Sequence, residues 1–146
     1  MSKQCGHFEY KVYDLRRVKD VYFYDDVYIA QGEFLLLFIE VKNISGGTSY
    51  FGQFGPQVVA LSAPGAGSGA AVTGKSKASR YAQWMYQSGS FYEDINPGNV
   101  LGLVEAYDLP SDQEYFLAFG LESCAETTDT ILSLGMWSQV PRGHKK

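Results

Sequence analysis

The stretch between Gln31 and Ser45 constrains the fold more than any other part of this sequence. It contains a nearly unbroken apolar run, opens on Gly32 and closes on turn-forming residues that end in the pair Gly46-Gly47. A short apolar run rich in aromatic and β-branched residues is typical of a strand covered on both faces, although a buried helix can have the same composition. The alternation of apolar and polar residues over 39–42 favours the strand. We predict that it is the central strand of a β-sandwich.

Short β-prone runs separated by turn residues fill most of the remaining chain. Aromatic residues make up 15% of the sequence, which favours β structure because such side chains pack well on a pleated surface. The predicted strands are 8–15, 21–24, 27–30, the central strand, 57–61, 100–109, 115–121 and 131–137. Asp25-Asp26 and Asn96-Pro97-Gly98 mark turns, and residues 16–20 form a charged connection. We therefore predict one domain, 1–146, an all-β, immunoglobulin-like antiparallel β-sandwich of seven to eight strands with its core in residues 8–137.

Residues 62–79 differ in composition from the rest of the chain, because Gly, Ala and Ser dominate them. They carry no periodic apolar face, so we predict a long flexible loop or arm. Residues 69–76 match the phosphate-binding pattern GxxxxGKS, in which Lys75 and Ser76 would contact phosphate and magnesium. That motif needs a strand running directly into the loop and a helix after it. Residues 76–87 could form three helical turns, but no strand directly precedes the loop, so we expect no nucleotide binding.

Charge is distributed unevenly along the chain. Residues 1–80 carry nine Lys or Arg and seven Asp or Glu, whereas residues 81–141 carry nine Asp or Glu and no base. Residues 138–146 form a basic tail. The acidic half argues against a nucleic acid partner. If the two halves present different faces, copies could associate head to tail; if their strands interleave, the charges mix and the chain is a monomer.

Two cysteines, Cys5 and Cys124, lie far apart in the sequence and match no metal-binding or redox spacing. We expect two separate, half-buried thiols, with a disulfide in an oxidising compartment as the alternative. No apolar run is long enough to span a bilayer. No signal peptide is visible after Met1. The expected location is therefore extracytoplasmic if a signal sequence was removed, and otherwise a virion or another particle.

Three short motifs resemble a known family. They are Val41-Lys42-Asn43 at the end of the central strand, Ile95-Asn96-Pro97-Gly98, and Tyr107-Asp108-Leu109-Pro110 at the end of a later strand. This pattern resembles the telokin-like, immunoglobulin-like domains of bacterial lipoproteins and secreted antigens, and the resemblance covers roughly residues 8–135. It implies an immunoglobulin-like sandwich in an extracytoplasmic protein without enzymatic activity. Short structural motifs of this kind imply no particular ligand.

The sequence contains no convincing catalytic or metal-binding constellation. The adjacent acids Asp25-Asp26 and Glu93-Asp94 could take part in calcium sites, but acidic pairs in turns are usually only solvated, and no EF-hand spacing is present. The histidines, His7 and His144, lie near the termini, where a catalytic base would be poorly held. We therefore expect no enzymatic activity, no cofactor, and no catalytic, cofactor-binding or metal site.

Aromatic residues are more numerous than one core needs, with 11 Tyr and 9 Phe. Some must lie on the surface, where aromatic side chains are enriched in binding sites. The possible interface residues are Tyr50, Phe51, Phe54, Tyr81, Trp84, Tyr86, Phe91 and Tyr92. We predict a non-enzymatic binding or adhesion domain of an extracytoplasmic or surface protein, whose partner is a protein or a second copy, with carbohydrate also possible. The alternative is a structural subunit of a surface filament or a virion decoration protein, which self-associates through the arm and the aromatic patches.

Overall fold

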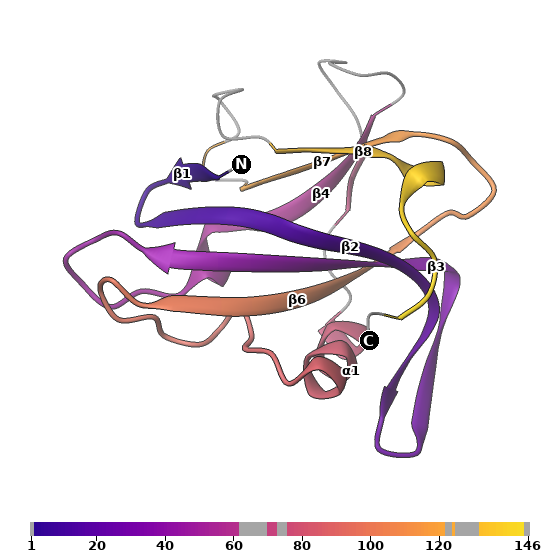
Figure 1. Ribbon diagram of the computed structural model, residues 1–146, viewed down its shortest axis with the longest axis horizontal. Coiled ribbons are helices and arrows are strands. Elements are labelled where there is room, and N and C mark those ends of the chain that lie inside the picture. Colours follow the sequence, from indigo (N-terminus) through magenta and orange to yellow (C-terminus); the bar gives the residue numbers. More distant parts are fainter. Residues whose placement is uncertain (1, 62–69, 73–75, 122–123, 125–131, 145–146) are drawn as a thin grey trace.

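The computed structural model describes residues 2–61, 70–72, 76–121, 124 and 132–144, and within them the chain forms two four-stranded sheets and one α-helix (Figure 1). The first sheet has the order β1-β2-β3-β6 and the second the order β5-β4-β7-β8, and every pairing is antiparallel. The elements are β1 (Lys3–Cys5), β2 (Phe8–Phe23), β3 (Asp26–Asn43), the 3₁₀-helix η1 (Phe51–Phe54), β4 (Pro56–Leu61), β5 (Ala70–Val72), α1 (Ser76–Tyr86), β6 (Val100–Leu109), β7 (Phe116–Leu121), β8 (Leu132–Met136) and the 3₁₀-helix η4 (Trp137–Gln139). The predicted antiparallel β-sandwich is confirmed.

Strand β3 is the central strand that the sequence predicts. It pairs with β2 on one side and with β6 on the other. Residues 34–39 are all buried, and they alternate between two cores. The odd-numbered residues pack between the two sheets, whereas the even-numbered residues pack toward α1. Burying an aliphatic or aromatic side chain contributes about 1.5–3 kcal/mol, so β3 is a principal source of the stability of the fold.

Helix α1 forms a third layer, which covers the face of the first sheet that points away from the second sheet (Figure 1). Its buried residues Ala78, Tyr81 and Ala82 follow the spacing of a single helix face, and Lys77 and Arg80 are exposed. Small side chains on the buried face let the helix lie close to the sheet. No helix in the described part of the chain is long and apolar enough to cross a membrane.

The predicted loop over residues 62–79 is wrong wherever the structure describes it. Residues 70–72 form strand β5, which pairs antiparallel with β4, and α1 begins at Ser76. In a phosphate-binding loop, residues 70–72 would wrap around phosphate groups, and an edge strand of an antiparallel sheet has a different geometry. The other residues of this segment, 62–69 and 73–75, lie outside the described residues.

Strand β2 is longer than predicted, because residues 16–20 continue the strand and do not form a connection. Arg17 explains how this charged segment lies in the sheet. Its side chain is 4% exposed, its guanidinium carbon lies 3.9 Å from the centre of the Trp137 ring, and Nη2 donates to Glu33 Oε1 at 2.8 Å. A second nitrogen donates to the Trp137 carbonyl at 3.0 Å. A buried charge is tolerated only with such partners.

Strands β2 and β3 form a hairpin whose far end projects beside α1 (Figure 1). The last cross-strand pair is Phe23↔Asp26, so the turn lies at residues 24–25, one residue earlier than the predicted pair of acids. Tyr24 has φ 56°, a left-handed conformation that few residues other than glycine adopt. A register shift between Val18 and Asp20 interrupts the ladder, and such irregularities bend a strand.

The predicted basic tail, residues 138–146, packs against the sandwich as far as the structure describes it. Val140 is buried, and residues 141–143 run beside β2. Arg17 N donates to the Pro141 carbonyl at 2.8 Å, and Gly143 N donates to the Arg17 carbonyl at 2.9 Å. These bonds satisfy backbone groups on part of the exposed edge of β2.

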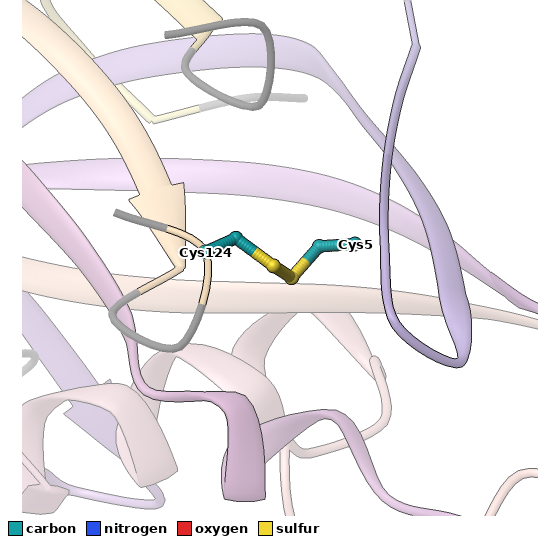
Figure 2. The surroundings of a disulfide bond; sticks show 2 residues. All are labelled: Cys5 and Cys124. Atoms are coloured by element: carbon teal, nitrogen blue, oxygen red, sulfur yellow. A yellow bond between two sulfur atoms is a disulfide. The ribbon is translucent and has the colours of Figure 1, made fainter. Parts of the chain in front are cut away.

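Cys5 and Cys124 are joined by a disulfide, so the expectation of two separate thiols is wrong (Figure 2). Cys5 ends β1 in the first sheet, and Cys124 follows β7 in the second sheet. Their Cα atoms lie 6.2 Å apart, within the range that a disulfide bridges. A separation of 119 residues in the sequence gave no sign of this proximity, because it depends on how the two sheets pack.

The two halves of the sequence, which differ in charge, interleave in the fold. Strand β3 from the first half pairs with β6 from the second, and β4 pairs with β7. Each sheet therefore contains strands from both halves, and the idea that the halves present two different faces is wrong. The hypothesis of head-to-tail assembly depended on such separate faces, so the fold does not support it.

Candidate binding surface at the hairpin tip

Exposed hydrophobic side chains gather at the far end of the β2–β3 hairpin and on the adjoining part of α1. Among the described residues, ten large hydrophobic side chains are exposed, and five of them belong to this region. We call them the hairpin-tip surface, which consists of Tyr22, Tyr24, Val27, Ile29 and Trp84. Single exposed hydrophobic residues are common in soluble proteins, but a cluster is typical of an interaction site.

Strand periodicity explains why the hairpin exposes apolar residues on one side. The pairs Val21↔Tyr28 and Tyr22↔Val27 are neighbours in the ladder, so their side chains point to opposite faces. Val21 is fully buried against the core that contains α1. On the other face, Val27 is 45% and Ile29 is 64% exposed. The hairpin is therefore apolar on both faces although only one face has a covering layer in the described structure.

The aromatic part of the surface is held in place by contacts between rings. The Tyr24 ring centre lies 4.9 Å from that of Trp84 and 4.8 Å from that of Phe23. Phe23 and Trp84 are 5.5 Å apart, which closes a triangle of rings. Tyr24 nevertheless remains 70% exposed. Ordered but exposed rings lose little conformational entropy on binding, which favours affinity.

Polar groups surround these rings. The Tyr81 hydroxyl donates to Asp26 Oδ2, and this hydrogen bond is the main cause that raises the pKa of Tyr81. The Tyr22 hydroxyl donates to Asp20 Oδ2 at 3.0 Å, and this bond likewise raises the pKa of Tyr22. Lys77 Nζ lies 5.4 Å from the centre of the Tyr28 ring. An apolar centre with a polar rim is the usual composition of a protein interface.

The eight residues predicted for an interface lie in different environments. Tyr50, Trp84 and Tyr92 are exposed, whereas Phe51, Tyr81 and Phe91 are buried, and Phe54 and Tyr86 are partly buried. The buried rings are core residues, which removes them from any surface. Of the exposed three, Trp84 joins the hairpin-tip surface, and Tyr50 and Tyr92 form a separate pair with ring centres 6.4 Å apart.

The four hairpin residues of the surface were missed because the sequence analysis assigned them only to strands. A signal was present, since residues 21–24 and 27–30 are apolar at both alternating positions. Such a pattern predicts either burial on both faces or an exposed apolar face. Only the tertiary structure decides between the two.

Two of the four acids considered for chemistry, and both histidines, have structural partners. Asp26 accepts the hydrogen bond of Tyr81, and Glu93 Oε2 accepts one from Ser90 N at 2.7 Å. His7 Nδ1 lies 3.2 Å from Ser49 Oγ, and His144 lies between Tyr86 and Asp20. In the described ranges, no three His, Cys, Asp or Glu side chains gather in a way that suits a metal ion.

The sequence matches no known protein-family model. Among curated proteins no relative matches it either. Similarity appears among solved structures. A conserved hypothetical protein from Bacillus anthracis is 14% identical and aligns with a TM-score of 0.60 over 85% of this chain and 88% of its own. The yjhA protein from Bacillus subtilis is 13% identical, with a TM-score of 0.56 over 92% and 95% of the two chains.

A third neighbour is an uncharacterized β-sandwich protein from Clostridium difficile, 12% identical, with a TM-score of 0.56 over 92% of this chain and 89% of its own. At such low identity, the similarity shows a shared β-sandwich fold and nothing more. The coverage of both chains in all three alignments means that the sandwich is shared nearly from end to end.

Proposed function

We propose that the chain is a non-enzymatic, extracytoplasmic binding domain that recognises another protein through the hairpin-tip surface. The observation that carries this proposal is the group of exposed apolar side chains formed by four residues of the hairpin that projects beside α1 and by Trp84 of α1 (Figure 1). A rigid sandwich that presents a projecting loop or hairpin is a common arrangement for recognition.

Two further observations support the extracytoplasmic location. The Cys5–Cys124 disulfide joins the two sheets, and disulfides persist mainly in oxidising compartments. The short motifs that resemble telokin-like domains of bacterial lipoproteins and secreted antigens favour the same location, and we propose this family as the closest description of the fold.

The composition of the surface favours a protein partner over a carbohydrate. Sugars bind to flat aromatic rings, and Tyr24 and Trp84 alone would suit them. Val27 and Ile29 add branched aliphatic side chains, which provide no stacking surface but pack well against apolar side chains of another protein. Because Val27 and Ile29 point away from the hairpin face that packs on α1, a protein that encloses the projecting hairpin would contact both the aromatic rings and these aliphatic side chains.

Removing the two exposed rings at the tip should abolish partner binding and leave the fold intact. We expect the double variant Tyr24→Ala/Trp84→Ala to lose at least about 30-fold in affinity, because even one hot-spot ring is worth about 2 kcal/mol or more. Unfolding free energy should change by only about 1 kcal/mol, since both rings are exposed. The immobilised chain would be used to capture partners from the cell-envelope fraction of its source, followed by affinity measurement with the captured protein.

The matched control is Ile44→Ser, because Ile44 is 43% exposed and follows the other end of β3. It should bind as the unaltered chain does. Equal capture by the double variant and the unaltered chain would refute the hairpin-tip surface as the binding site.

A further inference from the structure

A buried acid lies beside α1, in a cavity of about 580 Å³. The cavity is lined by α1, β6, the segment from η1 to the start of β4, and residues 90–92. Its volume is in the range of small-molecule sites. Glu105, on β6, is 9% exposed and contributes its carboxyl group to the lining.

Only one oxygen of this carboxyl group accepts a hydrogen bond from the described residues. Ser79 Oγ donates to Glu105 Oε1 at 2.9 Å, and the same Oγ accepts from Ala106 N at 3.0 Å. The serine therefore fixes the position of the acid at the edge of β6. In the described part of the chain, no Lys, Arg or His forms an ion pair with Glu105, and Oε2 has no hydrogen-bond donor. A buried carboxylate without a cation is energetically costly.

The environment of Glu105 leaves the carboxyl group partly protonated near neutral pH. Burial raises its pKa from 4.5 to about 7, and the hydrogen bond from Ser79 opposes this rise only partly. The phenol of Tyr107 is fully buried and has no hydrogen-bond partner among the described residues; burial and, to a smaller extent, the charge of nearby Glu105 raise its pKa. A cationic group in the cavity would stabilise the ionised carboxylate of Glu105 and would therefore lower the pKa of Glu105 again.

The other walls of the cavity combine apolar and polar groups. Pro56 and the exposed ring of Tyr92 contribute apolar surface. Gln83 and Ser90 contribute polar groups, whereas the Phe91 side chain is buried in the core. Gly52 allows this close arrangement, because a Cβ there would lie 3.3 Å from the Tyr92 ring and 3.0 Å from the Phe91 carbonyl. Aromatic rings attract cations as well as flat apolar groups. Arg80 also lines the cavity, but it is exposed, so water and salt weaken its repulsion of a cation.

We propose that this cavity binds a small organic amine, with its ammonium group at Glu105 Oε2 and its flat apolar body against Tyr92 and Pro56. Such a ligand supplies the cation that Glu105 lacks and covers the apolar walls. This site is independent of the hairpin-tip surface, and either one can be present without the other.

Benzylamine is a suitable probe, because it combines an ammonium group with one aromatic ring. We expect it to bind the full chain at about pH 8 with a Kd on the order of 1 mM, as befits a ligand of this size. In two-dimensional NMR spectra, the amide signals of Gly52, Phe91 and Ala106 should shift. Benzyl alcohol, which lacks the charge, should bind at least about ten-fold more weakly.

Glu105→Gln keeps the shape of the side chain and removes its charge, so benzylamine affinity should fall at least about ten-fold to that of benzyl alcohol. Asp94→Asn is the matched control, since Asp94 is an exposed acid just beyond the cavity-lining residues 90–92. It should leave binding unchanged. The proposal is overturned if benzylamine shifts none of these amides at about 20 mM, about twenty times the expected Kd, or if it binds both variants equally.

Discussion

Reduction of the Cys5–Cys124 disulfide should lower the free energy of unfolding by about 4 kcal/mol. The bridge closes a loop of 119 residues, and the stabilisation from restricting the unfolded chain grows slowly with loop length. It also ties β1, the edge strand of the first sheet, to the segment after β7 in the second (Figure 2). Without it, β1 keeps only its three pairs with β2. Urea denaturation of the oxidised and the reduced chain measures the difference.

The double variant Cys5→Ser/Cys124→Ser should show the same loss as reduction, and reductant should not affect it further. An unchanged urea midpoint after complete reduction would contradict the bridge as a structural element. A loss of about 4 kcal/mol is a large share of the roughly 5–15 kcal/mol by which a typical domain is stable, so the disulfide suits the proposed extracytoplasmic location.

The second large effect concerns Glu105→Gln. This substitution should remove the loss of stability that Glu105 causes as the pH rises. The pKa of Glu105 is raised from 4.5 to about 7 by burial. As pH rises from about 4.5, the unfolded chain releases this proton first, so folding becomes less favourable up to about pH 7 and then levels off. At about 1.4 kcal/mol per pKa unit, Glu105 costs about 3 kcal/mol above pH 7. Glu105→Gln should therefore be the more stable protein at about pH 8 and nearly equal at about pH 4.5.

The quantity to measure is the difference in unfolding free energy between variant and unaltered chain over this pH range. The difference matters because other acids act in the opposite direction; the side-chain hydrogen bond with Ser138, for instance, lowers the pKa of Glu114. Asp94→Asn, which removes one acid at an exposed position, serves again as control. A difference for Glu105→Gln that stays flat with pH would contradict the raised pKa of Glu105.

The central strand could be predicted from the sequence because its composition leaves no polar face between Phe34 and Ile39. What covers its second face could not be predicted. The covering helix has Ala78 and Ala82 on its buried side, and alanines give a weak amphipathic signal. A run rich in Gly, Ala and Ser precedes it, which favours the prediction of a loop.

Gly32 is structurally important, but for a different reason than the sequence suggested. The sequence analysis treats it as a turn glycine, whereas it lies inside β3. A Cβ at this position would lie 2.0 Å from the Leu109 carbonyl oxygen. The glycine is needed because the end of β6 approaches β3 closely. Sequence alone cannot separate a turn from such a close approach.

The candidate sites were predicted only in small part. Trp84 was among the predicted interface residues, but Tyr24 and Ile29 were not, because exposure depends on which face of the hairpin α1 covers. Glu105 was counted only as part of an acidic surface. Its burial follows from the packing of Ser79 and α1 against the edge of β6. Ser79 and Glu105 are 26 residues apart in the sequence, so the sequence does not reveal this contact.

Hydrogen exchange of the chain with and without its captured protein partner tests the proposed binding surface most directly. The amides of residues 22–29, at the hairpin tip, should exchange more slowly in the complex, whereas those of residues 34–39 should be slow in both states because they are buried in the centre of the sheet. Unchanged exchange at residues 22–29, together with new protection around Tyr50 and Tyr92, would contradict the hairpin-tip surface and place the interface at the other exposed aromatic pair.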